Sequence, residues 1–473
     1  MLPNPRHWPW WGWALCVVAT LGTMTLSAAL IYRQTGIHLL RAEVARLHAA
    51  GYGVVPADLS QQLPLVDRAR QNRAWALFGP TGPSWNEPKY PIAGMTEKKS
   101  ISSASPESTR IERNLEIARN LDDSKTARSE WVTLSTEGPL VLTGLGWLTI
   151  DPATSSLADF EANASNCVAS LLRIRQLANA FAVESRTATD PRPALVALDT
   201  LVAGQDHPGY LIDAMILLST SQIRDEAWLE AVLRGTDPQP WLANTVPCLT
   251  RIADSIAIER MLWCGMQSQR ILDGKTPGYN PSTWKSFPRS RSAWESITET
   301  LSDSGWSIFA PTDNLWYLRG ITECERLSRD GLGDPAALIK EIYDFRWRVL
   351  TAAIALPNLA ETVKTGARAE LKQRRNRLSG ALIQFWNTTK SLPNALSELP
   401  PLTAQLAIPR ADLPVIRYTR VSPTRFLLDS DPATPGTNMV PSGTITAAPT
   451  LSGPYLSGQW SLELDLADLE KYP

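Results

Sequence analysis

The feature that most constrains this chain is an uncharged, apolar stretch near its N-terminus, residues 13–32, with the sequence WALCVVATLGTMTLSAALIY. As an α-helix this stretch reaches about 30 Å, the thickness of the hydrocarbon core of a bilayer. Aromatic side chains, which place a ring in lipid and a polar atom among the headgroups, flank it at both ends. They are Trp8, Trp10, Trp11, Trp13 and Tyr32. The sequence therefore predicts a membrane anchor, with the lipid bilayer as its partner.

The flanking charges leave the orientation of this anchor open. Arg33, Arg41 and Arg46 follow it and outnumber Arg6, which by the positive-inside rule favours a cytoplasmic location for the rest of the chain. A short basic leader, an apolar stretch and Ser27-Ala28-Ala29 are instead typical of an export signal, and long domains are translocated largely regardless of flanking charge. We favour export across the inner (cytoplasmic) membrane, to a periplasmic or extracytoplasmic location.

The tryptophans favour an anchor that is retained over a leader that is cleaved. Two specialised leaders do not fit. A lipoprotein leader needs small residues before its cysteine, but Trp13-Ala14-Leu15 precede Cys16. A prepilin leader needs a glutamate early in the apolar run, and the residues after Gly12 carry no carboxylate.

Composition indicates a globular protein beyond the anchor. Of 473 residues, 44 % are hydrophobic and 20 % charged, and the net charge of −1 gives no reason to expect nucleic acid as a partner. Outside the anchor there are four cysteines, Cys167, Cys248, Cys264 and Cys324. In an exported domain they allow two disulfides with three possible pairings, but we favour buried free thiols. No CxxC pair indicates zinc or a redox dithiol.

Hydrophobic periodicity predicts a mainly α protein. Ile37, Leu40, Val44 and Leu47 indicate a stalk helix that extends the anchor. Further helices are expected from Leu249 to Leu272, from Asp334-Pro335 to Leu356 with a stop before Pro357, and from Leu359 to Thr389. Short connections favour a helical bundle or an irregular α-array.

The last part of the chain changes to strand-like patterns. Residues 415–421 and 425–429 are rich in β-branched and aromatic residues, and residues 460–466 alternate between apolar and polar. We expect a small antiparallel β module beside the last long helix. The predicted domains are a tail at 1–12, the transmembrane anchor at 13–32, a stalk helix and turn at 33–78, a flexible loop at 79–110, a helical domain at 111–358, and a long helix plus β module at 359–473.

One part of the sequence resembles a known bacterial module. The run ARAELKQRRNRLSGALIQFWNTTKSLPNALSEL, followed by VIRYTRV and RFLLDSDP, is similar to the C-terminal half of type II secretion major pseudopilins. With its leader helix and the segment AAGYGVVPADL, the whole chain resembles an uncharacterised family of bacterial single-pass membrane-anchored helical proteins. The matching positions Leu392, Pro393, Leu396 and Leu399 imply packing and turn formation. Asp429-Ser430-Asp431 is a poor match to the calcium loop of pseudopilins, and capping of a turn is the favoured role.

Isolated motifs do not indicate chemistry. His38 and His48 lie about 15 Å apart on one helix and are expected to face solvent or the membrane interface. His207, in Asp206-His207-Pro208-Gly209, is read as part of a turn and helix cap and not as a general base. Gly274-Lys275-Thr276 lacks the first glycine of a phosphate loop, so Gly274 is read as a helix cap. We predict no cofactor and no metal site.

Two clusters remain as candidate surfaces. The basic run Lys372, Arg374, Arg375 and Arg377 is interpreted as a solvated helix face. The aromatic group formed by Trp306, Phe309, Trp316 and Tyr317 either packs between helices, which we favour, or lines a groove for a sugar or peptide.

These patterns favour a non-catalytic protein, with unknown envelope proteins as partners, that acts as an interaction or scaffold component of the cell envelope. One alternative is an envelope hydrolase, or a carbohydrate- or peptide-binding protein, with a groove among the tryptophan-bearing helices. The nearby carboxylates Glu323, Glu325 and Asp330 do not define a catalytic pair, because Glu323 and Glu325 would point to different faces of a helix. A second alternative is a secretion-pilus-like component.

Overall fold

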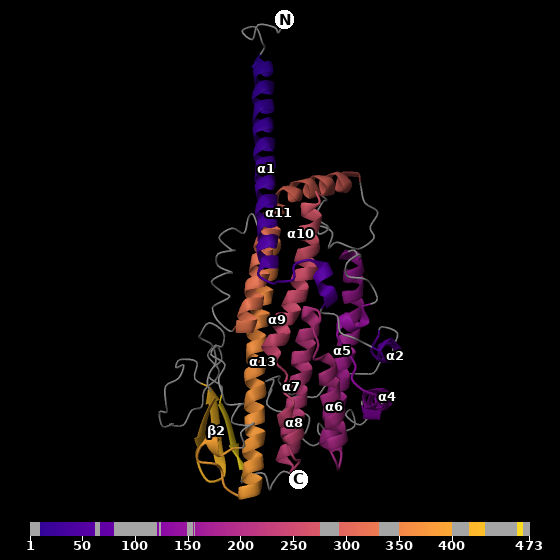
Figure 1. The fold of residues 1–473 in the computed structure, drawn as a ribbon, viewed down its shortest axis with the longest axis vertical. Helices are drawn as coiled ribbons and strands as arrows, with labels where there is room; N and C mark the ends of the chain where they lie inside the picture. The colour runs from indigo at the N-terminus through magenta and orange to yellow at the C-terminus, as the bar shows by residue number, and fades with distance from the viewer. Residues whose placement is uncertain are drawn as a thin grey trace, which may run out of the picture. The chain divides into compact units, whose positions relative to one another are not determined.

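The computed structural model describes residues 10–61, 67–79, 121–122, 124–148, 155, 157–274, 293–330, 350–399, 416–430 and 461–466. These residues form long helices and a small antiparallel sheet, which confirms the predicted fold class (Figure 1). The chain separates into two compact units. The first, here the anchor unit, comprises Met1–Leu59, Arg260–Thr322 and Ala337–Asn358; the second, here the bundle unit, comprises Ser60–Glu259, Glu323–Ala336 and Leu359–Pro473.

Helix α1 (Trp10–Ala49) contains both the predicted membrane segment and the predicted stalk as one uninterrupted helix. In the predicted membrane segment the large apolar side chains are exposed, from Trp13 at 52 % to Ile31 at 67 %. Beyond it the helix packs through one stripe, in which Leu40 and Leu47 are completely buried. The spacing of this stripe matches one face of a helix, as the sequence pattern predicted.

The segment that follows α1 contains glycine at positions where its backbone conformation requires it. Gly51 has a φ of +82°, which ends the helix, and the Asp58 carboxylate accepts hydrogen bonds from the backbone N–H groups of Val54 and Val55. Arg260 Nε donates to the Gly53 carbonyl at 2.8 Å, and its guanidinium lies 5.0 Å from the centre of the Tyr52 ring. The short 3-10 helix η2 (Pro56–Gln61) comes next.

The helix predicted from Leu249 to Leu272 is present, but a π-helical turn divides it into α9 (Cys248–Glu259) and α10 (Gly265–Leu272). The π turn, Arg260–Cys264, lies in contact with the segment that follows α1. At this point Gly265 leaves room for the backbone of Val54. A π turn is rare and occurs mostly as a single turn within an α-helix. After α10, Gly274 with a φ of +74° confirms the predicted cap.

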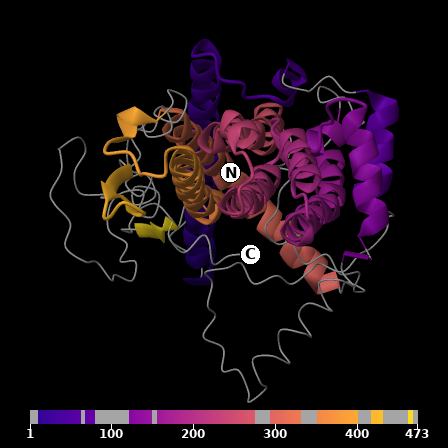
Figure 2. The ribbon, with the colours of Figure 1, turned by 90° about the horizontal axis from the view of Figure 1, so that it is seen from below.

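The bundle unit is built from helices that pack side by side. Three of them, α5 (Leu157–Thr187), α6 (Arg192–Gln205) and α7 (Leu211–Leu233), contact one another and are seen nearly end-on in Figure 2. Helix α9 packs on α7, while α2 (Arg68–Phe78) and α4 (Lys125–Thr136) pack on each other and on α5. A 3-10 turn, η3 (Gly144–Trp147), and the short α8 (Gln239–Ala243) join them.

Two long helices complete the helical part, α11 (Ala293–Asp330) and α13 (Leu350–Thr389). The expected stop before Pro357 is wrong, because α13 continues through this proline. A proline inside a helix removes one backbone hydrogen bond. Burial of Leu356, Leu359 and Ala360 on either side outweighs that loss. The expected start at Asp334-Pro335 and the loop at 80–110 lie outside the described residues.

The predicted β module is confirmed. Strands β1 (Ile416–Arg420), β2 (Arg425–Ser430) and β3 (Ser461–Asp465) form an antiparallel sheet in the order β1-β2-β3. The register pairs Tyr418 with Leu428 and Leu428 with Leu462. The turn before the sheet, with η6 (Leu396–Glu398), buries Leu392 and Leu399, and the Tyr418 hydroxyl donates to the Pro393 carbonyl at 2.7 Å.

Candidate functional site: a buried charge network in the bundle unit

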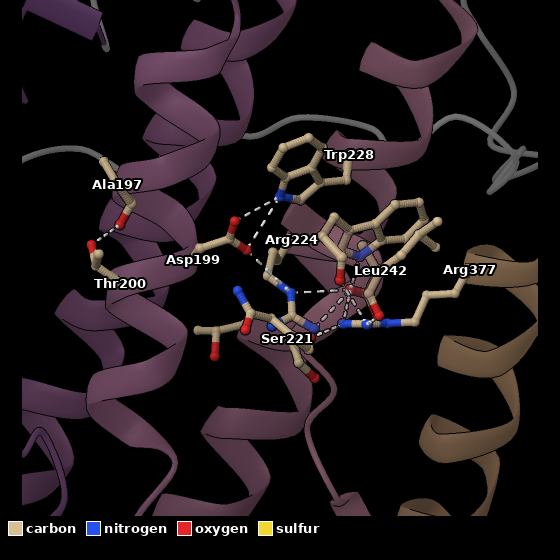
Figure 3. A network of polar contacts seen from close by, with 12 residues as sticks. Ala197, Asp199, Thr200, Ser221, Arg224, Trp228, Leu242 and Arg377 are labelled. Atoms are coloured by element: carbon tan, nitrogen blue, oxygen red, sulfur yellow. Dashed lines mark hydrogen bonds and ion pairs between the residues drawn. The ribbon is translucent and has the colours of Figure 1, made fainter. Parts of the chain in front are cut away.

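Two arginines and two aspartates lie inside the bundle unit, in contact with one another (Figure 3). Asp199 comes from α6, Arg224 and Asp225 from α7, and Arg377 from α13. Arg224, Asp225 and Arg377 are buried, Arg377 with no exposure at all, and Asp199 is half-buried. Burial of a charge is costly unless it is paired, so the network must supply partners to each member.

Asp225 is the acceptor shared by most of the network. Its Oδ1 accepts from Arg224 Nη2 at 2.9 Å and from the Trp241 indole at 2.8 Å. Arg377 Nη2 lies 4.0 Å from the same oxygen. One carboxylate thus joins residues of α7, α8 and α13.

Asp199 holds the other end of the network. Its two oxygens accept from the Trp228 indole at 3.2 and 3.1 Å, and Oδ1 lies 3.8 Å from Arg224 Nε. The rings of Trp228 and Trp241 are nearly parallel, with centroids 6.3 Å apart. Each indole therefore provides apolar packing with its ring and a hydrogen bond with its N–H.

Arg377 makes its contacts mainly with backbone carbonyls. Its guanidinium donates to the carbonyls of Trp241, at 2.7 Å, and Leu242, at 3.1 Å, and also to that of Asn244. It also lies over the Trp241 ring, 5.6 Å from the centroid. These carbonyls are at the end of α8, where a cation is stabilised by the free carbonyl groups and the helix dipole. Gly380 on α13 leaves the space that the Trp241 ring occupies.

Burial shifts the ionisation of the network in opposite directions for acids and bases. Desolvation raises the pKa of Asp199 to about 6, although Arg224 and the Trp228 hydrogen bond oppose the shift. Desolvation also lowers the pKa of Arg377 to about 10, against the attraction of Asp225. For Arg224, desolvation lowers the pKa, but Asp225 and Asp199 outweigh it and the net shift is upward. Both arginines stay charged at neutral pH.

This geometry corrects the interpretation of the basic run as a solvated helix face. Arg377 is in the core, and Arg375 is half-buried, with its guanidinium donating to Asn376 Oδ1 at 3.1 Å. Lys372 pairs with Glu226 at 2.6 Å and Arg374 with Glu370 at 2.8 Å. Arg377 lies on the same face of α13 as the buried Val363, Ala367 and Glu370, but the charges of Glu370 and Arg377 hide this face from the hydrophobic pattern of the sequence.

A second polar cluster lies at the start of α7. The fully buried Asp213 accepts from the backbone N–H groups of Tyr210, at 2.6 Å, and Gly144, at 3.0 Å. Tyr210 donates its hydroxyl to Asn163 at 2.8 Å, and Glu259 accepts from the N–H of Leu211 at 3.1 Å. These contacts satisfy backbone N–H groups at the helix start, so the cluster is a cap. Desolvation raises the pKa of Asp213 to about 7.

His207 lies in the turn before this cap, as predicted, but the cap residue is Tyr210. Asp206 pairs with Arg251 at 2.6 Å. Burial lowers the pKa of His207, which keeps the ring neutral at pH 7. His38 and His48 are exposed on α1, as expected for residues that face solvent or the membrane interface. His48 Nε2 lies 3.4 Å from the Asp58 carboxylate.

The predicted aromatic group is only partly described. Trp316 and Tyr317 are half-buried on α11, with the Arg319 guanidinium 5.9 Å from the centre of a Trp316 ring. Phe309 is 36 % exposed, and the side chain of Trp306 is outside the described residues. Glu323 and Glu325 pair with Arg326 and Arg329 on the same helix. The groove stays a prediction.

Of the predicted membrane aromatics, Trp10, Trp11 and Trp13 are exposed on α1, Tyr32 is half-buried, and Trp8 lies outside the described residues. All five cysteines are free thiols, and the four outside the membrane segment are buried. Within the described part of the chain, no three His, Cys, Asp or Glu side chains gather as metal ligands do.

The charge network is arranged to hold helices together. Asp225 has its close contacts with cations and N–H donors, and Arg377 with carbonyls and an indole ring, so these groups already have protein partners. No protein-family model, curated protein or solved structure matched the chain.

Proposed function

We propose that this protein is a single-pass, membrane-anchored scaffold component of the cell envelope, with its helical region on the extracytoplasmic side. The observation that carries the proposal is the division of α1. Its first half exposes large apolar side chains along its whole length, and its second half is packed within the anchor unit. A helix with these two halves joins a bilayer to a folded region without a flexible linker.

The polar groups of the apolar segment are compatible with a location in lipid. The hydroxyls of Thr20, Thr23 and Thr25 each donate to the carbonyl four residues earlier, at 2.8 Å. In lipid no water is present to satisfy a hydroxyl, so internal hydrogen bonds of this kind are required.

The buried charge network supports a scaffold role. It fixes the relative positions of α6, α7, α8 and α13 by directional contacts, which favours one rigid arrangement of the bundle unit. On its surface Val168 and Leu172, four residues apart on α5, expose adjacent apolar side chains of the kind that protein partners contact.

The membrane part of the proposal is tested by fractionation. The full chain should stay with the membrane pellet after extraction with alkaline carbonate, and protease added outside intact spheroplasts should digest the helical region. Release by carbonate would overturn the anchor, whereas a fully protected helical region would overturn the extracytoplasmic side alone.

The scaffold part is tested by photo-crosslinking in the native membrane. Photoreactive residues at positions 168 and 172 should give adducts with one defined envelope protein. The double variant Val168→Glu with Leu172→Glu should reduce recovery of that protein at a third probe position, such as the exposed Val132. Equal recovery of the envelope protein with the double variant and with the natural chain would count against this face as the contact surface.

A further inference from the structure

We propose that the turn of α11 around Phe309 lies in the headgroup layer beside α1 and gives the anchor unit a second contact with the bilayer surface. This inference rests on the proposed membrane anchor. It concerns residues 307–309, of which Phe309 belongs to the aromatic group described above. The partner is the lipid surface itself.

The contact between α1 and α11 begins where the apolar segment ends. The rings of Tyr32 and Phe309 lie 5.7 Å apart, centre to centre, and Arg33 Nε donates to the Ser307 carbonyl at 3.3 Å. One residue earlier, Ile31 is still 67 % exposed. Residues 307–309 therefore lie level with the last residues of α1 that are expected to contact lipid.

Helices α1 and α11 run in the same direction, so their contacts can be followed away from the level of Tyr32 and Phe309. Along α1 the contact moves from Tyr32 to Gly36 and Glu43, and along α11 it moves from Phe309 to Thr312 and Arg319. A Cβ on Gly36 would lie 2.9 Å from the Thr312 hydroxyl, and Glu43 pairs with Arg319 at 3.5 Å. The later contacts thus lie progressively farther from the membrane.

The chemistry at this level suits the interface. Phe309 is 36 % exposed although it packs on Tyr32, so an aromatic edge remains available to lipid. Arg33 beside it supplies a cation at the height of the phosphates. Membrane interfaces combine apolar and aromatic side chains on the lipid side with Lys and Arg on the headgroup side. Phe309, packed on the half-buried Tyr32, thus adds an exposed aromatic edge at the end of the anchor opposite to the exposed tryptophans at its start.

Spin labels on the full chain in phospholipid vesicles can measure the depth of each site. The native Cys16, exposed on α1, serves as the lipid standard, since the other four thiols are buried. Burial raises the pKa of Cys167 and Cys324 to about 12, which suppresses their labelling further. In a Cys16→Ser background, Phe309→Cys is the test, and His38→Cys is the aqueous control. His38 is exposed on α1, about 9 Å beyond Tyr32 along the helix axis.

We expect the ratio of oxygen to nickel-chelate collisions to be highest at position 16, intermediate at 309 and lowest at 38. A value at 309 equal to that at 38, with position 16 still in lipid, would overturn the inference and leave the anchor intact. An aqueous value at position 16 would overturn the anchor and the inference together.

A second probe keeps the aromatic ring in place. Benzoylphenylalanine at position 309 should form adducts with phospholipid on irradiation, and the same residue at position 38 should form several-fold fewer. Equal yields at the two positions would count against the inference even if the cysteine variant does not fold.

Discussion

Arg377 shows how a single residue can be placed in the core by its partners and not by its own polarity. Its charge is compensated by Asp225, by the carbonyls that end α8 and by the face of Trp241. Removing one member of such a set leaves the others buried without partners, which costs more than the intact contact contributes.

We expect Arg377→Met to destabilise the protein by about 3–5 kcal/mol, the range for breaking a buried ion pair from one side. The matched control on the same helix is Arg368→Met. Arg368 pairs with Glu361 at the surface, and exposed pairs contribute about 1 kcal/mol or less. Urea denaturation in detergent, followed by circular dichroism, measures both. Equal losses for the two variants would contradict the assignment of Arg377 to the core network.

Asp199 makes stability depend on pH in a defined window. Its pKa is raised to about 6 by burial, compared with about 3.9 in an unfolded chain. The folded protein therefore binds this proton more tightly, and its contribution to the free energy of unfolding falls as the pH rises from about 4 to about 6.

Asp199→Asn cannot titrate but retains an oxygen that can accept from Trp228. The stability of this variant relative to the natural protein should therefore increase between about pH 4 and pH 6 and be constant above about pH 7. Denaturation curves of both proteins across this range measure the difference. A difference that does not change with pH would contradict the upward shift of the pKa.

At the scale of elements, hydrophobic periodicity was sufficient to predict the helices and strands that bury only one face. It located the stalk in α1, the helix from Leu249 to Leu272 and the strands of the β module, because apolar residues recur there with the period of the element. It failed at Pro357 and at Arg377, where a local rule about proline or charge was overruled by packing. Tertiary contacts that override local preference are not readable from one chain.

The π turn at Arg260–Cys264 is a further element that periodicity did not show. It is paired with a distant segment, since Gly265 faces the backbone of Val54, and Gly53 faces Met261. The glycines after α1 indicate that this segment packs closely against another part of the chain. The sequence does not identify that part.

Gly265→Ala should test this pairing. A methyl group there would overlap the Val54 carbonyl oxygen, which is backbone and cannot rotate away. We expect a loss of about 1–3 kcal/mol, as for other overpacked sites. Gly22→Ala is the control, because no atom lies within 4 Å of the added Cβ, and its effect should stay within about 1 kcal/mol. Equal thermal stability of the two variants would contradict the close approach of this segment.

At the scale of the molecule, α1 serves two environments with two surfaces. Before Tyr32 the large apolar side chains of α1 are exposed, and after Arg33 the helix presents a stripe of Gly36, Leu40, Glu43 and Leu47 to the anchor unit. The first part is therefore dispensable for folding if it belongs to the membrane, while the second part is a component of the core.

Two truncations separate these roles. A chain that lacks residues 2–31 keeps the buried stripe and should be soluble without detergent, with a cooperative unfolding transition. A chain that lacks residues 2–50 loses Leu40 and Leu47, both completely buried, and exposes the apolar surface that they cover. Removing two such side chains costs about 2–5 kcal/mol each, enough to unfold or aggregate a domain of ordinary stability. Sedimentation velocity and thermal melts compare the two. If both truncated chains were equally soluble and cooperative, the stalk would not belong to the core of the anchor unit. If the chain with the shorter deletion aggregated, the exposed half of α1 would have a role in folding that the membrane assignment does not provide.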